Sequence, residues 1–285
     1  MKKIKYFFEF IFITFLFIIF KILGHKLSSN FGSQIVNFLG PLFRSKKNII
    51  KNIKRAIPEI KEKELKIIIK KMWKNYGRIL AEYIFIKNFR YSNEKFVKVE
   101  GKDILNNIKN SKEKVIFISG HFNNFEFMAM EIERSGINLA AIYRPLNNLF
   151  LNKKMEEIRK KYICKNQIKK GRSGTRELLE YFKKNYSVAL MIDQRVSEGI
   201  KSNFFGQPAL TTTIPAQLVK KYNCKIVPIY IERINNFYFK MTVNKPIQYQ
   251  KNDTIEEITL DLNRWLEKKI LLNPDQWIWS HNRWK

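Results

Sequence analysis

His121 and Glu126 lie five residues apart, directly after an apolar run, and are the residues best placed for chemistry in this chain. The run Val115–Ser119 predicts a buried strand, so His121 should lie at its carboxyl end, where α/β proteins usually have their sites. A strand–turn–helix path, with one of the intervening asparagines as helix cap, would fold the carboxylate of Glu126 back towards the imidazole. A carboxylate on one ring nitrogen fixes the tautomer and leaves the other nitrogen as a base. Such a pair could activate a hydroxyl group directly, without a serine intermediate.

Composition and motifs argue against other kinds of active site. The chain has only three histidines, His25, His121 and His281, and no H-E-x-x-H motif, which disfavours a histidine-rich metal site. The absence of G-x-S-x-G disfavours a serine hydrolase. Cys164 and Cys224 lack metal-ligand spacing and cannot build a secreted disulfide framework, so a reducing compartment is the simpler inference. We expect no metal and no cofactor. A lone histidine at a strand end can also be purely structural, so this motif by itself is weak.

The elements that would position these residues alternate between strands and helices from residue 96 onward. The predicted strands are 96–99, 115–119, 139–143, 188–192, 226–231 and 237–243. The predicted helices are 102–110, 124–135, 148–162, 173–184, 213–222 and 254–271. This alternation predicts an α/β fold in which helices flank a mainly parallel or mixed sheet. The last two strands should form a hairpin, because Asn235-Asn236 is a turn signal.

The amino terminus has the sharpest break in composition. Residues Tyr6–Leu23 are almost wholly apolar, and a helix of that length spans roughly 27 Å, just enough for a bilayer core. No small-x-small cleavage site follows, so we favour an uncleaved anchor over residues 1–27 rather than a signal peptide. A helix lying in the cytoplasmic interface is the alternative. Residues 28–95 read as basic amphipathic helices with a break at Pro58, and residues 96–285 as one α/β catalytic core.

The net charge of +29 raises nucleic acid, an anionic membrane or an acidic protein as a partner. Most of the 54 basic residues are Lys, and Asn and Ile are also abundant, so lysines spread over solvated faces are the plainer interpretation. The chain lacks RNP, Cys/His and recognition-helix signatures, and the anchor also counts against nucleic acid. A non-catalytic protein that binds the membrane surface remains the alternative of a different class.

Several motifs, in order and at characteristic spacing, resemble those of the late acyltransferases of lipid A biosynthesis, within the wider H-x-x-x-x-[DE] glycerolipid acyltransferases. The resemblance runs from about Asn48 to Lys285. It is carried by Gly120-His121-Phe-Asn-Asn-Phe-Glu126, Tyr143-Arg144-Pro145-Leu-Asn-Asn148, Arg159, Asp193-Gln194, Phe204-Phe205-Gly206-x-x-Ala209-x-Thr211-Thr212-Thr213-x-x-Ala216 and Gln276-Trp277-Ile-Trp279-Ser-His-Asn-Arg283-Trp284-Lys285. Many relatives have Gly and Trp where this chain has Asn123 and Phe125.

The resemblance implies a role for each site residue and a glycerolipid-acyltransferase-like sandwich fold. His121 would be the general base and Glu126 its orienting partner. Arg144 and Arg159 would bind the phosphates of the glycolipid or polarise the thioester, since an arginine pairs bidentately with either group. Asp193 would belong to the substrate site by holding an arginine. The plainer interpretations are a strand-end cap for Arg144, a solvated helix face for Arg159 and a turn residue for Asp193.

The resemblance also implies the reaction and the partners. The protein would move a fatty acyl chain from the thioester of acyl carrier protein, an acidic donor, to a hydroxyl of a lipid A precursor. It would do so at the bacterial inner membrane, with the catalytic domain facing the cytoplasm. Coenzyme A as the carrier stays open, as does a lysophospholipid or another glycolipid as the acceptor. For the Phe204-Phe205-Gly206 segment we expect a loop that packs rather than lines the acyl pocket, and for the Trp-rich tail docking onto the core.

Overall fold

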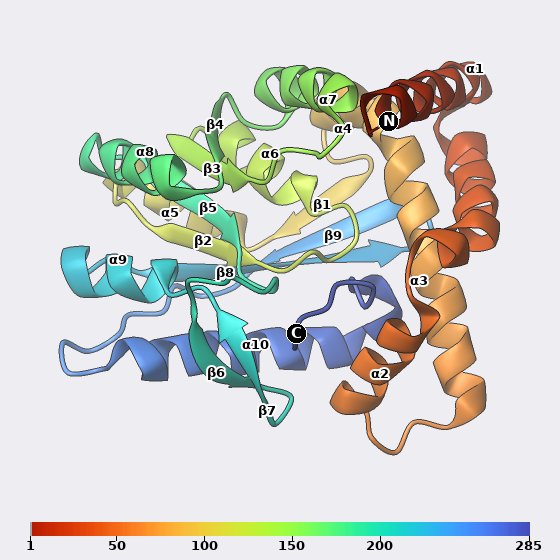
Figure 1. Ribbon diagram of the computed structural model, residues 1–285. Coiled ribbons are helices and arrows are strands. Elements are labelled where there is room, and N and C mark those ends of the chain that lie inside the picture. Colours follow the sequence, from red (N-terminus) through yellow and green to blue (C-terminus); the bar gives the residue numbers. More distant parts are fainter. Residues whose placement is uncertain (1) are drawn as a thin grey trace.

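A seven-stranded mixed sheet forms the centre of the computed structural model, which describes residues 2–285 (Figure 1). Its strands lie in the order β1-β9-β8-β2-β5-β3-β4. The five strands β8, β2, β5, β3 and β4 are parallel, β9 runs antiparallel to β8, and β1 is parallel to β9. The strands span Val97–Glu100 (β1), Ile116–Ser119 (β2), Leu139–Tyr143 (β3), Asn166–Lys169 (β4), Ser187–Met191 (β5), Ile226–Ile234 (β8) and Tyr238–Val243 (β9). This sheet, flanked by helices, confirms the predicted fold class.

Helices cover both faces of the sheet, so the central strands are buried on both sides. On β2, Phe117 belongs to one apolar core, whereas Ile116 and Ile118 belong to the other, as the alternation of side chains along a strand requires. The first core is covered by η1 (Tyr83–Phe85), α4 (Ile86–Arg90), α5 (Lys102–Ser111), α6 (Glu126–Arg134) and α7 (Leu149–Tyr162). The second core is covered by α8 (Arg172–Lys183), α9 (Ile214–Tyr222) and α10 (Ile255–Leu272), and Figure 1 draws α9 and α10 below the sheet.

The predicted strands and helices of the core are all present, with boundaries that differ by three residues at most. The hairpin between β8 and β9 is also confirmed, with Asn235 and Asn236 both at positive φ in the turn. Strand β4 was not predicted, because Asn166–Lys169 is a polar edge strand with no apolar run. The loop expected around Phe204-Phe205-Gly206 is wrong. Strands β6 (Ile200–Phe204) and β7 (Gln207–Thr211) form a separate antiparallel hairpin there, and Phe205 and Gly206 make its turn at positive φ.

The amino-terminal segment is a long helix with one kink. Helix α1 spans Lys2–Phe43, and Gly24 within it has non-helical angles (φ 73°, ψ 168°), so the predicted apolar segment is the first half. Residue 1 of the expected anchor lies outside the described residues. Among the helices within residues 2–285, α1 is the one long and apolar enough to cross a membrane. Helices α2 (Lys46–Ala56) and α3 (Glu62–Glu82) follow, on either side of the predicted break. The second half of α1 packs tightly on α3, where a Cβ on Gly32 would come within 2.6 Å of the Gly77 carbonyl oxygen.

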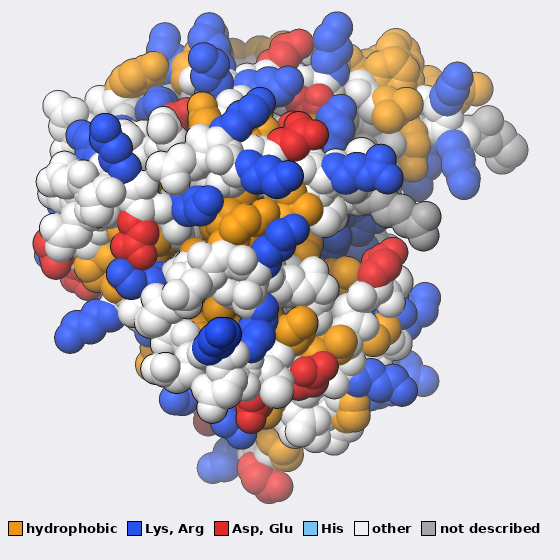
Figure 2. Space-filling view, turned by 90° about the vertical axis from the view of Figure 1, so that its left-hand side faces the viewer, with side chains coloured by type: hydrophobic (Ala, Val, Ile, Leu, Met, Phe, Trp, Pro, Cys, Tyr) orange, Lys and Arg blue, Asp and Glu red, His pale blue; other side chains and the backbone are white. Residues whose placement is uncertain are grey.

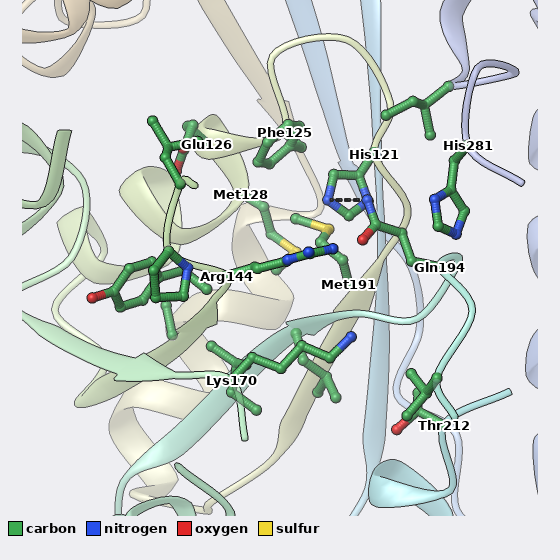
Figure 3. Close-up of a pocket in the computed structure, with 18 of the residues that line it drawn as sticks. His121, Phe125, Glu126, Met128, Arg144, Lys170, Met191, Gln194, Thr212 and His281 are labelled. Carbon is green, nitrogen blue, oxygen red and sulfur yellow. Dashed lines mark hydrogen bonds between the residues drawn. The ribbon is translucent and has the colours of Figure 1, made fainter. Parts of the chain in front are cut away.

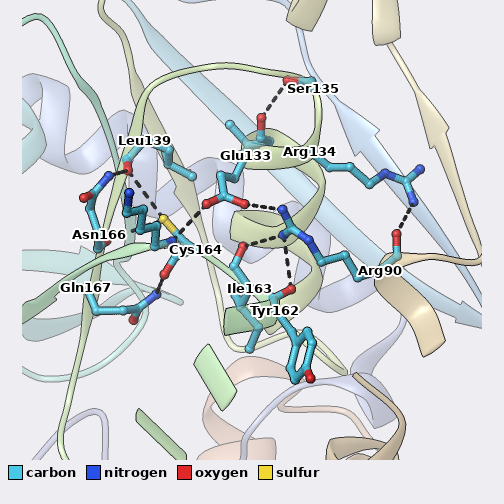
Figure 4. A network of polar contacts seen from close by, with 12 residues as sticks. Arg90, Glu133, Arg134, Ser135, Leu139, Tyr162, Ile163, Cys164, Asn166 and Gln167 are labelled. Atoms are coloured by element: carbon cyan, nitrogen blue, oxygen red, sulfur yellow. Dashed lines mark hydrogen bonds and ion pairs between the residues drawn. The ribbon is translucent and has the colours of Figure 1, made fainter. Parts of the chain in front are cut away.

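A polar network ties together the carboxyl ends of α4, α6 and α7 near the starts of β3 and β4, at the sheet edge opposite the site (Figure 4). Arg90 at the end of α4 pairs with Glu133 of α6 at 2.6 Å, and it also donates to the carbonyl oxygen of Tyr162 at the end of α7 at 3.2 Å. The backbone N–H of Lys165 donates to the other oxygen of Glu133 at 2.9 Å. These contacts hold α7, and with it Arg159, in a fixed position relative to α6.

Candidate active site

Two neighbouring parallel strands bring His121 and Asp193 together. Strands β2 and β5 pair with Ser119 opposite Met191, and the backbone N–H of Ile192 donates to the Ser119 carbonyl oxygen at 2.9 Å. Each site residue lies two positions beyond this last pair, so both emerge at the same edge of the sheet. His121 Nδ1 is 2.7 Å from Asp193 Oδ1, and the backbone N–H of His121 donates to Asp193 Oδ2 at 2.8 Å.

The surroundings of Asp193 keep its carboxyl group ionised. The side chain is fully buried, and Trp277 Nε1 donates a further hydrogen bond to Oδ2 at 2.8 Å. Burial opposes ionisation, but the charge and hydrogen bonds of His121 and the bond from Trp277 hold the pKa of Asp193 down at about 2. An ionised carboxylate only accepts hydrogen bonds, so Nδ1 of His121 must carry the proton. The lone pair is therefore on Nε2, as a general base requires.

The expectation that Glu126 orients the imidazole is corrected by the structure. Glu126 begins α6 and is buried, and its Oε1 accepts hydrogen bonds from Tyr83 Oη and from Arg159 Nε and Nη2, the latter two at 2.9 and 2.6 Å. The ring of Phe125 packs edge-on against the imidazole, with ring centroids 4.6 Å apart, and Figure 3 shows it between Glu126 and His121. The loop directs the carboxylate towards α7 and η1, and Asp193 takes the place expected for Glu126.

The loop between His121 and α6 is fixed by buried polar contacts rather than by a helix cap. Asn123 adopts positive φ, and its Nδ2 donates to Gln276 Oε1 at 2.6 Å, while Asn124 Nδ2 donates to Glu82 Oε2 at 3.1 Å. Glu82 in turn forms a buried ion pair with Arg233 of β8. Neither asparagine caps α6, contrary to the expectation, because both side chains are used in these longer-range contacts. They anchor this loop to α3, β8 and the segment around Gln276.

Arg159 is a buried partner of Glu126 and not part of a solvated helix face. Its side chain is only 9% exposed, and Glu126 raises the pKa of the guanidinium although burial works against the charge. Its carbon Cζ lies 5.4 Å from the centre of the Tyr143 ring. Its Nη1 is buried and has no hydrogen-bond partner among residues 2–285. Because Asp193 is bonded to His121 and Trp277, the expectation that it holds an arginine is also corrected.

A cavity of about 820 Å³ opens in front of the imidazole (Figure 3). Its deep wall is largely apolar and includes Met128, Ala129, Ala141, Ile163, Ala189 and Met191. Its polar lining includes His121, Glu126, Arg144, Arg159, Lys170, Gln194 and His281. The structure thus gathers four of the five predicted site residues around one cavity, with Asp193 behind the imidazole. A cavity with an apolar inner wall and polar groups at one side suits an amphipathic ligand.

Arg144 and Lys170 form a cationic corner of this cavity. Figure 3 shows the Arg144 side chain reaching across the cavity near Met128 and Met191, with Lys170 beside it. Burial and the neighbouring Arg144 lower the pKa of Lys170, and no described acidic side chain forms a salt bridge with either cation. Two cations held together in this way suit an anionic group on a ligand. Lys170 follows a polar edge strand, and no sequence signal singled it out.

The carboxyl-terminal tail docks onto the core, as expected, and completes the site from behind. Trp277 and Trp279 are buried, and Arg283 donates to the Leu210 carbonyl oxygen and to Thr211 Oγ1, each at 2.6 Å. The same tail supplies His281 to the cavity lining. Gln194 and His281 both belong to sequence motifs, but the motifs predict no role for either residue.

An imidazole with a fixed tautomer at a strand end, facing a partly apolar cavity, is an arrangement that suits an α/β enzyme. The model of the bacterial lipid A biosynthesis acyltransferase family matches residues 1–285, so the chain belongs to this acyltransferase family. The lipid A biosynthesis acyltransferase of Haemophilus influenzae is 21% identical over 243 residues, covering 82% of this chain and 76% of that protein. The palmitoleoyltransferase and the lauroyltransferase of lipid A biosynthesis from Escherichia coli are each 22% identical, covering 89% and 92% of this chain and 83% and 85% of their own lengths. The resemblance drawn from the motifs is thereby confirmed.

Proposed function

We propose that the protein transfers a fatty acyl chain from the thioester of acyl carrier protein to a hydroxyl of a phosphorylated lipid A precursor. The observation that carries this proposal is the His121–Asp193 pair, which holds the basic Nε2 at the edge of a cavity with an apolar depth and a cationic corner. Family membership supplies the substrate class. The residues supply the chemistry.

In this mechanism His121 acts as general base. Its Nε2 takes the proton of the acceptor hydroxyl as that oxygen attacks the thioester carbonyl carbon, and Asp193 stabilises the imidazolium that forms. Collapse of the tetrahedral intermediate breaks the carbon–sulfur bond. The imidazolium then returns the proton to the departing thiolate, so the enzyme ends in its starting state. General-base catalysis contributes about a hundred- to ten-thousandfold.

The two arginines would act on different parts of the substrates. Arg144, together with Lys170, would bind an acceptor phosphate, because both cations face the cavity and form no salt bridge within residues 2–285. Arg159 would act on the reacting centre through Glu126, which we propose as a residue that shapes the wall of the cavity next to the base. Loss of either member would leave a buried charge without its partner.

The apolar surface of α1 would hold this site at the inner membrane, with the catalytic domain in the cytoplasm. Asn148 Nδ2 donates to the Tyr6 carbonyl oxygen at 2.8 Å, and the Phe7 and Phe150 rings lie 5.7 Å apart, so the first half of α1 rests against α7. Its outer side chains, such as Phe8 and Phe12, are exposed. Helix α1 ends at Phe43, which lines the cavity. A lipid-linked acceptor could therefore reach the site from the membrane surface.

The basic surface would attract both partners. Figure 2 shows Lys and Arg side chains spread over the face on the left of Figure 1, among hydrophobic side chains and fewer acidic ones. A net charge of +29 would attract anionic lipid headgroups and steer an acidic carrier protein towards the enzyme.

Mass spectrometry of lipid A from cells with and without the gene tests the substrate. We expect lipid A from cells lacking the protein to lose one acyl group, and expression of the wild-type chain, but not of His121→Ala or Glu126→Ala, to restore it. Phospholipids should be unchanged. Unchanged lipid A with altered phospholipid acylation would instead identify a lysophospholipid as the acceptor, and restoration by a folded His121→Ala protein would contradict the general-base mechanism.

A further inference from the structure

The amide of Gln194 lies at the atom that has to act as base. Gln194 Nε2 is 3.3 Å from His121 Nε2, the ring nitrogen that faces the cavity, and Figure 3 shows the two side chains directed at each other. Since Asp193 fixes the proton on Nδ1, Nε2 accepts this hydrogen bond and the amide donates it. The acceptor hydroxyl must bind at the same nitrogen, so the amide has to turn aside when the substrates are bound.

The backbone on both sides of Gln194 is held, so that only its side chain is free to turn. On one side Asp193 is bonded to His121 and Trp277. On the other side the backbone N–H of Arg195 donates to His281 Nε2 at 3.0 Å, and Arg195 Nε donates to the Lys285 carbonyl oxygen at 3.0 Å. A side chain on a backbone fixed in this way can be placed precisely relative to the reacting atoms.

The protonation state of His281 suits this arrangement. Burial lowers the pKa of His281 to about 4, and the nearby His121, Arg283 and Lys170 work in the same direction against the opposing influence of Asp193. The ring is therefore neutral at neutral pH, and its Nε2 has a lone pair that can accept the hydrogen bond from Arg195. A protonated ring would present a donor there and release the Gln194–Arg195 peptide.

We propose that Gln194 is a further catalytic residue, whose amide N–H donates to the thioester carbonyl oxygen in the transition state, and that His281 is the positioning residue that holds the Gln194 peptide. The inference rests on the proposed acyl transfer. As the hydroxyl oxygen forms its bond to the carbonyl carbon, the carbonyl π electrons move to oxygen. The resulting oxyanion accepts the amide hydrogen bond, and its collapse expels the thiolate, which takes the proton from His121.

The reach of the side chain agrees with this role. An attacking oxygen within hydrogen-bond distance of His121 Nε2, about 3 Å, would take the position that the amide now holds. The carbonyl carbon lies about 3–3.5 Å further on in a near-attack geometry. If the Gln194 side chain turns to a neighbouring rotamer, its amide leaves His121 Nε2 and still lies beside the carbonyl oxygen. A neutral donor is suitable, because it stabilises the oxyanion without pairing permanently with a substrate phosphate.

Gln194→Met tests the proposal, because methionine has a similar length and no donor. Removal of one oxyanion donor typically lowers kcat about a hundred- to a thousandfold. We expect such a loss with the purified full chain, with KM for donor and acceptor changed by less than about threefold. Gln248→Met is the matched control, since the Gln248 side chain is exposed and among residues 2–285 donates only to Asn223 and Tyr249, and this variant should keep wild-type kcat. Gln194→Glu, an acceptor of nearly the same shape, should be as slow as Gln194→Met.

His281 has its own test and the outcomes are separable. His281→Phe removes the acceptor for Arg195 and should lower kcat about tenfold, whereas His281→Gln, which offers an acceptor oxygen, should recover part of the loss. Wild-type kcat in both Gln194 variants, a faster Gln194→Met enzyme, or a change in acceptor KM alone would overturn the oxyanion role. If His121→Ala is inactive in the same series, such a result excludes only the oxyanion role of Gln194 and leaves the proposed acyl transfer standing. An active His121→Ala would mean that the general-base mechanism of the proposed function fails, and no acyl transfer by the wild type would mean that the proposed function itself fails.

Discussion

Replacing Asp193 by asparagine should disable the base while leaving its shape intact. Asp193 Oδ2 accepts two hydrogen bonds, from the His121 backbone N–H and from Trp277 Nε1, each at 2.8 Å, whereas Oδ1 meets His121 Nδ1. In Asp193→Asn the amide oxygen should keep the Oδ2 position, because it is the only acceptor left. The amide nitrogen then faces Nδ1 and donates to it. The imidazole proton is forced onto Nε2, the atom that has to accept the substrate proton.

The size of the effect follows from the alternative arrangement. Recovering the working tautomer means turning the amide over, which sets its NH₂ group against two buried N–H donors. Each hydrogen bond lost at a buried group costs about 2 kcal/mol, so the working form lies about 4 kcal/mol higher. At 1.4 kcal/mol per factor of ten, this predicts a kcat about a thousandfold below the wild type.

The free energy of unfolding of Asp193→Asn should fall as well. The pKa of Asp193 drops from 3.8 to about 2 on folding, which stabilises the fold by about 2 kcal/mol above pH 4, and this contribution is lost as the pH falls towards 2.

Single-turnover transfer of a labelled acyl chain, together with urea unfolding from pH 2 to 7, measures both quantities. Asp103→Asn is the matched control, because Asp103 is an exposed residue in the first turn of α5. Glu126→Gln is the informative contrast, since it disturbs the contacts with Arg159 and Tyr83 and leaves the imidazole tautomer in place. A kcat for Asp193→Asn within tenfold of the wild type would refute the tautomer argument.

Three further predictions concern the rest of the molecule. Burial raises the pKa of Glu131 from 4.5 to about 7, so the folded state holds a proton that the unfolded state releases, and the unfolding free energy falls by up to about 3 kcal/mol as the pH rises through this range. Glu131→Gln should therefore be more stable than the wild type in urea at pH 8 but not at pH 4; equal stability at both pH values would exclude this. Arg144→Lys should raise the acceptor KM about tenfold with kcat kept, because lysine lacks the planar guanidinium fork, whereas Arg159→Lys should lower both kcat and the free energy of unfolding. Steady-state kinetics with each substrate varied would contradict both roles if the two variants matched the wild type. Replacing the exposed Phe8 and Phe12 by serine should weaken binding to anionic vesicles in flotation assays without changing the melting temperature, and undiminished flotation would argue against α1 as the membrane contact.

The fold could be predicted largely from local patterns, and so could the edge of the sheet that carries the site. The apolar runs before His121, Arg144 and Asp193 each predict a strand, and these three residues do lie beyond the carboxyl ends of parallel strands. Strand β4 could not be predicted in this way, because three of its four residues are polar and carry no apolar pattern. The β6–β7 hairpin could not be predicted either, because Phe205 at positive φ in its turn is unusual for a bulky residue.

The contacts within the site could not be predicted, because they depend on the order of the strands in the sheet. His121 and Asp193 meet because β2 lies beside β5, although β3 and β4 come between them in the chain. Glu126 was expected at the imidazole because it is close in sequence. Its actual direction depends on the turn at Asn123 and on the approach of Arg159 from α7.

Reconstitution of the reaction with purified components tests the central claim most directly. The full-length protein and its His121→Ala variant would each be incubated with acyl carrier protein bearing a fatty acyl thioester and with a phosphorylated lipid A precursor, and the glycolipid would be analysed by mass spectrometry. We predict that the wild type adds one alkali-labile acyl group to the precursor and releases the free thiol of the carrier, whereas folded His121→Ala adds none. The account would be contradicted if folded wild-type protein left the precursor mass unchanged. It would also be contradicted if the His121→Ala variant acylated the precursor as well as the wild type does.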